Sequence, residues 1–168
     1  MLKQLSTVLL SAVISVNAFA AADLNPAKQA FYKTLNSVSQ DFKKSVQAMQ
    51  QNEQKLQKSR AALQKKQHDN TLTQPEKQCV VALLDRATRS YSLVRSTINN
   101  VKQYDNQLTA LRGFVQRATV EQQMKQAADK GNQIIKQMDT MFAKNRTMSQ
   151  QWSKNVKTIC DRVPAPAK

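Results

Sequence analysis

The stretch Phe31–Leu63, FYKTLNSVSQDFKKSVQAMQQNEQKLQKSRAAL, decides the fold class of this chain. Within it an apolar residue recurs every seven positions, at Leu35, Phe42, Met49, Leu56 and Leu63. Such a repeat is typical of an α-helix that packs along neighbouring helices, as in a coiled coil. The companion apolar position holds Phe31 and Val38, and then the polar residues Ser45, Asn52 and Ser59. We therefore expect one long helix whose apolar stripe narrows toward its C-terminal half.

Capping signals predict where this helix and the next one begin. Asn25-Pro26 places a capping side chain before a proline, which is a favourable helix start. The first helix is expected to end at the polar turn His68-Asp69-Asn70. Thr73-Gln74-Pro75-Glu76 has the spacing of a capping box and predicts the start of a second helix.

A third helix is predicted after a break near residues 112–119. Arg112-Gly113 is a candidate stop for the second helix, because glycine commonly follows a helix end. Thr119-Val120-Glu121-Gln122 is a candidate second capping box, with Gln122 reaching back to Thr119. Pro164 and Pro166 end the ordered region.

These signals predict an all-α fold of three long antiparallel helices, an up-down-up bundle resembling a coiled coil. Each helix is expected to have roughly 40 residues, and short connections make consecutive helices antiparallel. The bundle is expected to cover residues 21–163, followed by a disordered tail at 164–168. A kink near 112–119, a four-helix form and an elongated dimer are the structural alternatives.

The N-terminus has the three parts of a secretory signal peptide, which we expect to cover residues 1–20. Lys3 supplies the positive region, Leu5–Val16 the apolar region, and Ala18-Phe19-Ala20 the cleavage pattern. The apolar run is shorter than the roughly 20 residues of a membrane-spanning helix. We expect export to the periplasm or outside the cell, with no transmembrane segment in the mature chain. The alternative is a buried N-terminal helix.

Export bears on the two cysteines, Cys79 and Cys160. In an oxidising compartment they are expected to form a disulfide. An up-down-up bundle brings the start of the second helix and the end of the third to the same end. A parallel arrangement would separate the two Cα atoms far beyond the roughly 7 Å limit of a disulfide.

The charge of the chain points to an anionic partner. The sequence has 26 Lys and Arg against 11 Asp and Glu. Residues 51–90 and 141–168, predicted to share the cysteine end, hold 14 basic and 5 acidic residues, a net charge of +9. The densest cluster is Lys55, Lys58, Arg60, Lys65 and Lys66, which we predict to bind phosphorylated lipid headgroups or another polyanion. The predicted extension of this surface is Arg86, Arg89, Lys154, Lys157 and Arg162.

Other chemistry has little support. Nucleic acid is disfavoured as a partner, because aromatic residues are only 5% of the chain and export removes it from the chromosome. Met124, Met138, Met141 and Met148 lie on the predicted apolar stripe of the third helix, where core packing explains them better than a copper site. The single histidine, His68, lies in a polar turn without a catalytic partner. We expect no enzyme activity, cofactor or metal.

Two short segments resemble degenerate copies of the Leu-Thr-x-x-Gln signature of small cationic periplasmic chaperones. They are Thr71–Glu76, TLTQPE, and Leu108–Arg112, LTALR, with Glu76 and Arg112 in place of the final glutamine. The leader, small size and basic helical body also resemble small substrates of bacterial type II secretion. The leading expectation is a non-enzymatic exported bundle that binds an anionic surface. A holdase-type chaperone and a structural or assembly protein, including a homodimer paired through coiled coils, are the alternatives.

Overall fold

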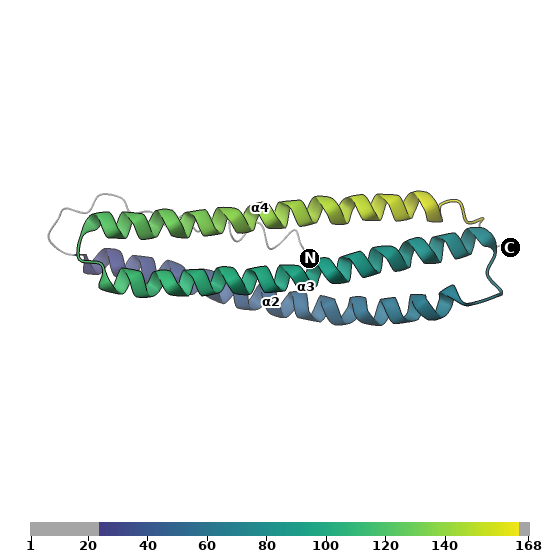
Figure 1. Cartoon of the computed structure of the whole chain (residues 1–168), viewed down its shortest axis with the longest axis horizontal. Coiled ribbons are helices and arrows are strands. Elements are labelled where there is room, and N and C mark those ends of the chain that lie inside the picture. Colours follow the sequence, from purple (N-terminus) through teal and green to yellow (C-terminus); the bar gives the residue numbers. More distant parts are fainter. Residues whose placement is uncertain (1–23, 165–168) are drawn as a thin grey trace. The chain divides into compact units, whose positions relative to one another are not determined.

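The computed structural model describes residues 24–164, which form three α-helices and, within that range, no strand. Helix α2 spans Asn25–Gln67, α3 spans Gln74–Arg117 and α4 spans Glu121–Cys160. Short connections at 68–73 and 118–120 join them (Figure 1). The predicted all-α class is confirmed. The predicted signal peptide at 1–20 and residues 165–168 of the predicted tail lie outside the described residues.

The described chain divides into two compact units, and every helix contributes to both. Unit 1 contains residues 24–47 and 99–143, and unit 2 contains residues 48–98 and 144–164. Within the described range, no helix is long and apolar enough to cross a membrane.

Contacts inside each unit show that consecutive helices are antiparallel. In unit 1, the Lys28 Nζ near the start of α2 donates to the Gln116 carbonyl near the end of α3, at 3.3 Å. The Asn100 side chain of α3 lies 3.4 Å from the Met141 sulfur of α4 in the same unit. In unit 2, Cys79 at the start of α3 is bonded to Cys160 at the end of α4. The predicted up-down-up order is therefore confirmed.

Unit 1 has a closely packed apolar core. Its α2 segment buries both positions of the heptad repeat, with Phe31, Val38 and Phe42 each only 2% exposed. Helix α3 contributes Val101 and Val115, which are completely buried. Helix α4 contributes Met124, Ala127 and Met138, so two of the methionines weighed as copper ligands are core residues.

Unit 2 is packed less completely. Leu56 and Leu63 continue the heptad repeat on α2 but are only half-buried. On α3 and α4 the same is true of Tyr91 and Trp152. The buried members of this unit include a polar pair, Thr97 and Asn145, whose side chains form a 2.8 Å hydrogen bond between α3 and α4. The narrowing of the stripe that the sequence predicts thus corresponds to a weaker core.

The helix boundaries agree with the sequence in one connection and differ in the other. The Thr73 backbone N–H and hydroxyl both donate to the Glu76 carboxylate at 2.7 Å, as expected for a helix start at this motif. Helix α3 does not stop at Gly113, since its hydrogen-bonded ladder continues to Arg117. A methyl group at Gly113 would meet only the Arg117 side chain, at 3.6 Å, so nothing there requires a break.

The second predicted capping box is displaced by one residue. Helix α4 begins at Glu121, and Gln123 rather than Gln122 reaches back to the preceding backbone. The Gln123 side-chain oxygen accepts from the Thr119 N–H at 2.7 Å and from the Val120 N–H at 3.4 Å. The physical reason is that the capping glutamine belongs three residues after the residue that precedes the helix, here Val120.

Candidate functional site: the basic surface of unit 2

The candidate site is built on a rigid pair of helix ends in unit 2. The Cα atoms of Cys79 and Cys160 are 4.7 Å apart, and the two sulfurs are bonded, as the sequence predicts. Together with the Thr97–Asn145 hydrogen bond, this bond ties α3 to α4 at two levels. The α2 segment of the unit is joined to α3 only through the loop 68–73 and side-chain packing.

Four of the predicted binding residues form an exposed lysine arc on α2. Lys55, Lys58, Lys65 and Lys66 are all exposed. At 100° per residue they lie within an arc of roughly 100°, on the side of α2 away from Leu56. Among the described residues, none of their side chains takes part in a hydrogen bond or ion pair. The arc is therefore free to meet an anionic ligand.

Arg60 does not belong to this lysine arc, which corrects the prediction of five residues on one solvent face. It is half-buried and turned toward α3. Its Nε donates to the Thr88 hydroxyl at 3.2 Å, and its guanidinium lies 4.9 Å from the centre of the Tyr91 ring. These contacts make Arg60 a packing residue between α2 and α3.

The predicted extensions of the surface differ in availability. On α3, Arg86 is half-buried, and Arg89 forms an ion pair with Asp85 at 2.8 Å. On α4, Lys154 and Lys157 are exposed, and Arg162 is exposed just after the helix. The charges on α4 and the lysine arc of α2 are therefore two groups on different helices.

Sequence reasoning missed two exposed cations of the same unit. Arg95 on α3 and Lys144 on α4 are both exposed. Arg95 stands among uncharged neighbours and Lys144 has only Arg146 close to it in the sequence, so a search for dense basic clusters does not find them. Lys144 lies in the segment 141–168 that the sequence already places at the cysteine end, whereas only the packing of the helices assigns Arg95 to unit 2. The described residues of this unit carry 14 basic and 5 acidic side chains.

Two acidic residues moderate the charge at the α2–α3 connection. Asp69 accepts hydrogen bonds from the Thr71 N–H and hydroxyl at 2.9 and 2.6 Å, which hold its pKa below the usual value. Hydrogen bonds from Thr73 lower the pKa of Glu76 in the same way, and the charge of Lys66 adds a smaller lowering effect to each. The positive charge of Lys66 is therefore partly offset by two nearby carboxylates that stay ionised at neutral pH.

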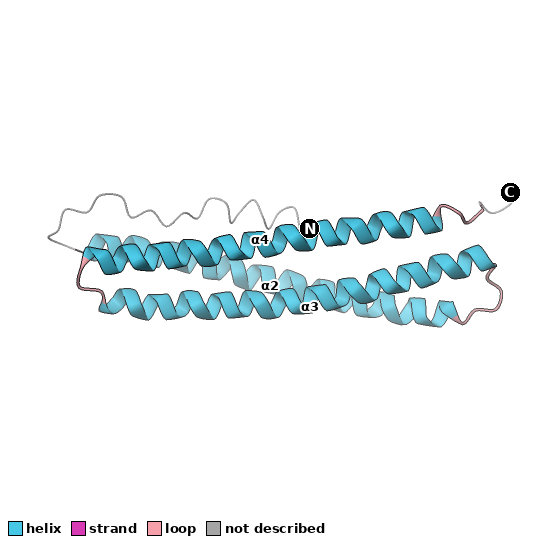
Figure 2. Ribbon diagram, turned by 45° about the horizontal axis from the view of Figure 1, so that its top comes forward, coloured by secondary structure: helices cyan, strands magenta, loops and turns pink. Residues whose placement is uncertain are grey.

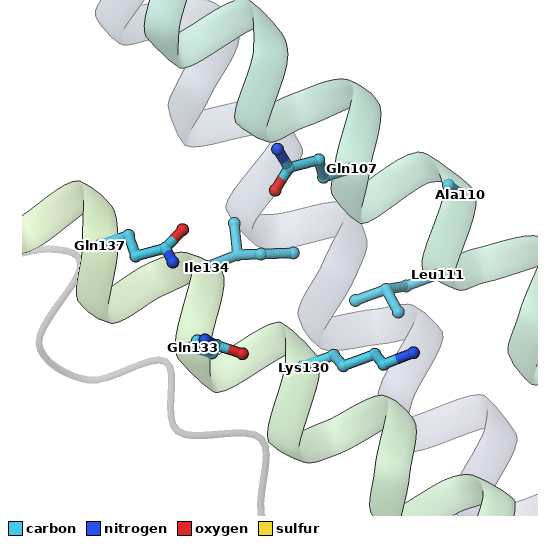
Figure 3. Close-up of a pocket in the computed structure, with 7 residues that line it drawn as sticks. All are labelled: Gln107, Ala110, Leu111, Lys130, Gln133, Ile134 and Gln137. Atoms are coloured by element: carbon cyan, nitrogen blue, oxygen red, sulfur yellow. The ribbon is translucent and has the colours of Figure 1, made fainter.

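Two shallow pockets lie in unit 1, away from the predicted basic residues. One, of about 370 Å³, lies between α3 and α4. Figure 3 shows Gln107, Gln133 and Gln137 on its sides, with Ile134 between the helices and Lys130 at one end. The other pocket, of about 270 Å³, lies between α2 and α3 beside Phe42 and Lys102.

The fold defines the chain as an all-α protein of three antiparallel helices with a disulfide between the second and the third. Compared with known proteins, the chain matches no family model, no curated protein and no solved structure. The function proposed below consequently rests on the chain's own residues.

Proposed function

We propose that this protein is an exported, non-enzymatic helical bundle that binds an anionic surface, namely phosphorylated lipid headgroups. The observation that carries the proposal is the lysine arc, Lys55, Lys58, Lys65 and Lys66, exposed on one side of α2. It lies in a unit whose described residues have a net charge of +9.

The energetics of this surface are sufficient for reversible binding. Each lysine close to an anionic membrane contributes about 1 kcal/mol. Four of them give about 4 kcal/mol, or roughly a thousandfold enrichment at the surface. The lysines are spread along three turns of one helix, so they fit a surface of many phosphates better than a single small anion. Because the arc is exposed, salt will screen the attraction strongly.

Vesicle co-sedimentation of the mature chain tests the proposal. We expect binding to vesicles of phosphatidylcholine with phosphatidylglycerol or a phosphoinositide, and none to phosphatidylcholine alone. Replacing Lys55, Lys58, Lys65 and Lys66 by Gln should abolish binding at physiological salt. The matched control replaces four exposed lysines of unit 1, Lys33, Lys44, Lys125 and Lys136, by Gln and keeps the same net charge. Equal loss in both variants, or equal binding to neutral and anionic vesicles, would refute the proposal.

A holdase-type chaperone is the second candidate, and the half-buried apolar side chains of unit 2, such as Leu63 and Trp152, favour it. Such a protein should suppress thermal aggregation of unrelated unfolded clients at stoichiometric concentration. Failure to suppress aggregation of any of several clients would remove this candidate.

A further inference from the structure

The heptad repeat of α2 changes character between the two units. One position of the repeat is Phe31 and Val38 in unit 1, where both side chains are 2% exposed. Continued in steps of seven, the same position is Ser45, buried at the border, and then Asn52, Ser59 and Lys66, which are all exposed. The other position stays apolar through Leu56 and Leu63. In unit 2, α2 therefore has one apolar row where a helix packed against two neighbours needs two.

This change leaves α3 between α2 and α4 in unit 2. The side chain of Arg60 on α2 contacts Thr88 and Tyr91, which both belong to α3. Near the cysteine end of unit 2, Figures 1 and 2 both draw α3 between the other two helices. Coverage of the apolar side chains in this unit is incomplete rather than absent: Val80, Ala87 and Val156 are buried, whereas other apolar side chains of α3 and α4 are only half-buried.

The consequence is an incompletely covered apolar face, which we call the open face. It consists of half-buried side chains on the apolar stripes of the three helices: Leu56 and Leu63 on α2, Leu84 and Val94 on α3, and Trp152 and Ile159 on α4. The disulfide Cys79–Cys160 and the Thr97–Asn145 hydrogen bond hold α3 and α4 together without help from α2. The part of the open face on α3 and α4 is consequently fixed in place before any partner binds, which lowers the entropic cost of binding.

We propose that the open face binds an acidic amphipathic helix of a partner protein. This helix packs against unit 2 as a fourth helix. Apolar residues at helical spacing along two tied helices match the i, i+3, i+4, i+7 anchors of a helix bound in a groove. Exposed cations lie beside the face: Lys66 is one turn beyond Leu63, and Lys157 is one turn before Cys160. The net charge of +9 on the unit favours an acidic partner and opposes a second copy of the same basic unit.

A bilayer is the competing occupant, and the geometry favours the helix. The apolar side chains lie at core positions between helices, and the polar row Asn52, Ser59 and Lys66 borders them on α2. Lys58 and Lys65, which serve the lipid proposal, point to the opposite side of α2, roughly 150° from Leu63. The headgroup surface and the open face therefore share Lys66, whereas Lys58 and Lys65 belong to the headgroup surface alone and distinguish the two surfaces in the tests.

Trp152 makes the proposal directly measurable, because it is the only tryptophan of the chain and belongs to the open face. The probe is a synthetic 21-residue helix without tryptophan, with Leu at the two heptad core positions and Glu at the flanking positions. Its matched control has Lys in place of every Glu. We expect the acidic peptide to shift Trp152 emission to the blue with a Kd of roughly 10 µM, and the basic peptide to give no shift at that concentration.

Two pairs of variants locate the binding surface. The substitutions Asn52→Leu and Ser59→Leu together restore the missing apolar row, so α2 should close over the open face. This variant should unfold at a higher temperature and bind the acidic peptide at least tenfold more weakly, while vesicle binding through the lysine arc stays unchanged. Its control, Gln57→Leu with Gln64→Leu, adds the same groups at exposed positions with the same spacing and should leave peptide binding unchanged.

Charge reversal tests the edges of the face. The double variant Lys66→Glu with Lys157→Glu should weaken binding of the acidic peptide about tenfold. Its control, Lys58→Glu with Lys65→Glu, makes the same charge change on the far side of α2 and should weaken binding about threefold or less. The proposal is overturned if the acidic peptide gives no shift up to roughly 100 µM. It is also overturned if Asn52→Leu with Ser59→Leu binds as tightly as the native chain. A larger Trp152 shift with vesicles than with the peptide would assign the open face to lipid instead.

Discussion

Removing the disulfide between Cys79 and Cys160 should destabilise unit 2 much more than unit 1. The bond closes a loop with a sequence separation of 81 residues, which includes most of α3 and α4. In the chain-entropy treatment, a loop of this size contributes about 4.5 kcal/mol to the free energy of unfolding. A domain of this size has a total of about 5–15 kcal/mol, so the loss is a large fraction of it.

The distribution of burial predicts where the loss is felt. Unit 1 keeps Phe42, Val101 and Val115 at 2% exposure or less without any covalent link. In unit 2, Leu84, Trp152 and Ile159 are only half-buried, so fewer apolar contacts oppose local opening. We therefore expect the ends of α3 and α4 near the cysteines to open in the variant while unit 1 stays folded.

The assay combines urea unfolding with hydrogen exchange on Cys79→Ala with Cys160→Ala. The expected result is a loss of up to about 4.5 kcal/mol and faster amide exchange in residues 74–90 and 148–160. Native protein treated with a reductant should match the variant, and the reductant should leave the variant itself unchanged. A loss below about 1 kcal/mol, or an equal loss of protection in residues 25–47, would refute the reasoning.

Three further predictions concern single side chains. Burial raises the pKa of Asp139, and one of its carboxylate oxygens has no hydrogen-bond partner among the described residues. The folded state therefore holds the Asp139 proton more tightly than the unfolded state, and stability falls as pH rises above the ordinary value of 3.8. Asp139→Asn should raise the thermal midpoint at pH 7 but not at pH 3, and an equal effect at both pH values would contradict this cause. Arg60→Ala should cost about 1–2 kcal/mol in urea unfolding through its lost contacts with Thr88 and Tyr91, whereas Lys58→Ala should cost less than about 0.5 kcal/mol. Gln123→Ala should lower the thermal midpoint because it removes the cap of α4, and Gln122→Ala should leave the midpoint unchanged. A larger loss with Gln122→Ala than with Gln123→Ala would support the capping box first expected from the sequence.

Much of the fold follows from local sequence signals. The seven-residue repeat from Leu35 to Leu63 and the capping box at Thr73–Glu76 predict the first two helices, because both depend on residues close together in the chain. The displaced start of α4 shows the limit of such signals. Gln122 and Gln123 are both glutamines, and only the position at which the helix begins decides which one caps it.

The candidate site divides in the same way. The sequence locates the cluster Lys55–Lys66, but it does not say that Arg60 turns away from the four lysines. That orientation depends on Tyr91 and Thr88, which are distant in sequence and lie beside Arg60 only after α2 and α3 pack. The charge of an exposed lysine is a property of the residue, whereas the role of an arginine beside a core position depends on its neighbours.

The sequence by itself determined that this chain is three long antiparallel helices with a basic cysteine end, because periodicity, capping and charge are local properties. The tertiary structure alone decided that the core is closely packed in unit 1 and that many apolar side chains stay only half-buried in unit 2. The cause was present in the sequence as Asn52 and Ser59, two polar residues in an apolar repeat. Its consequence required the packing of all three helices, because the exposure of a side chain depends on the neighbours that the other helices bring to it.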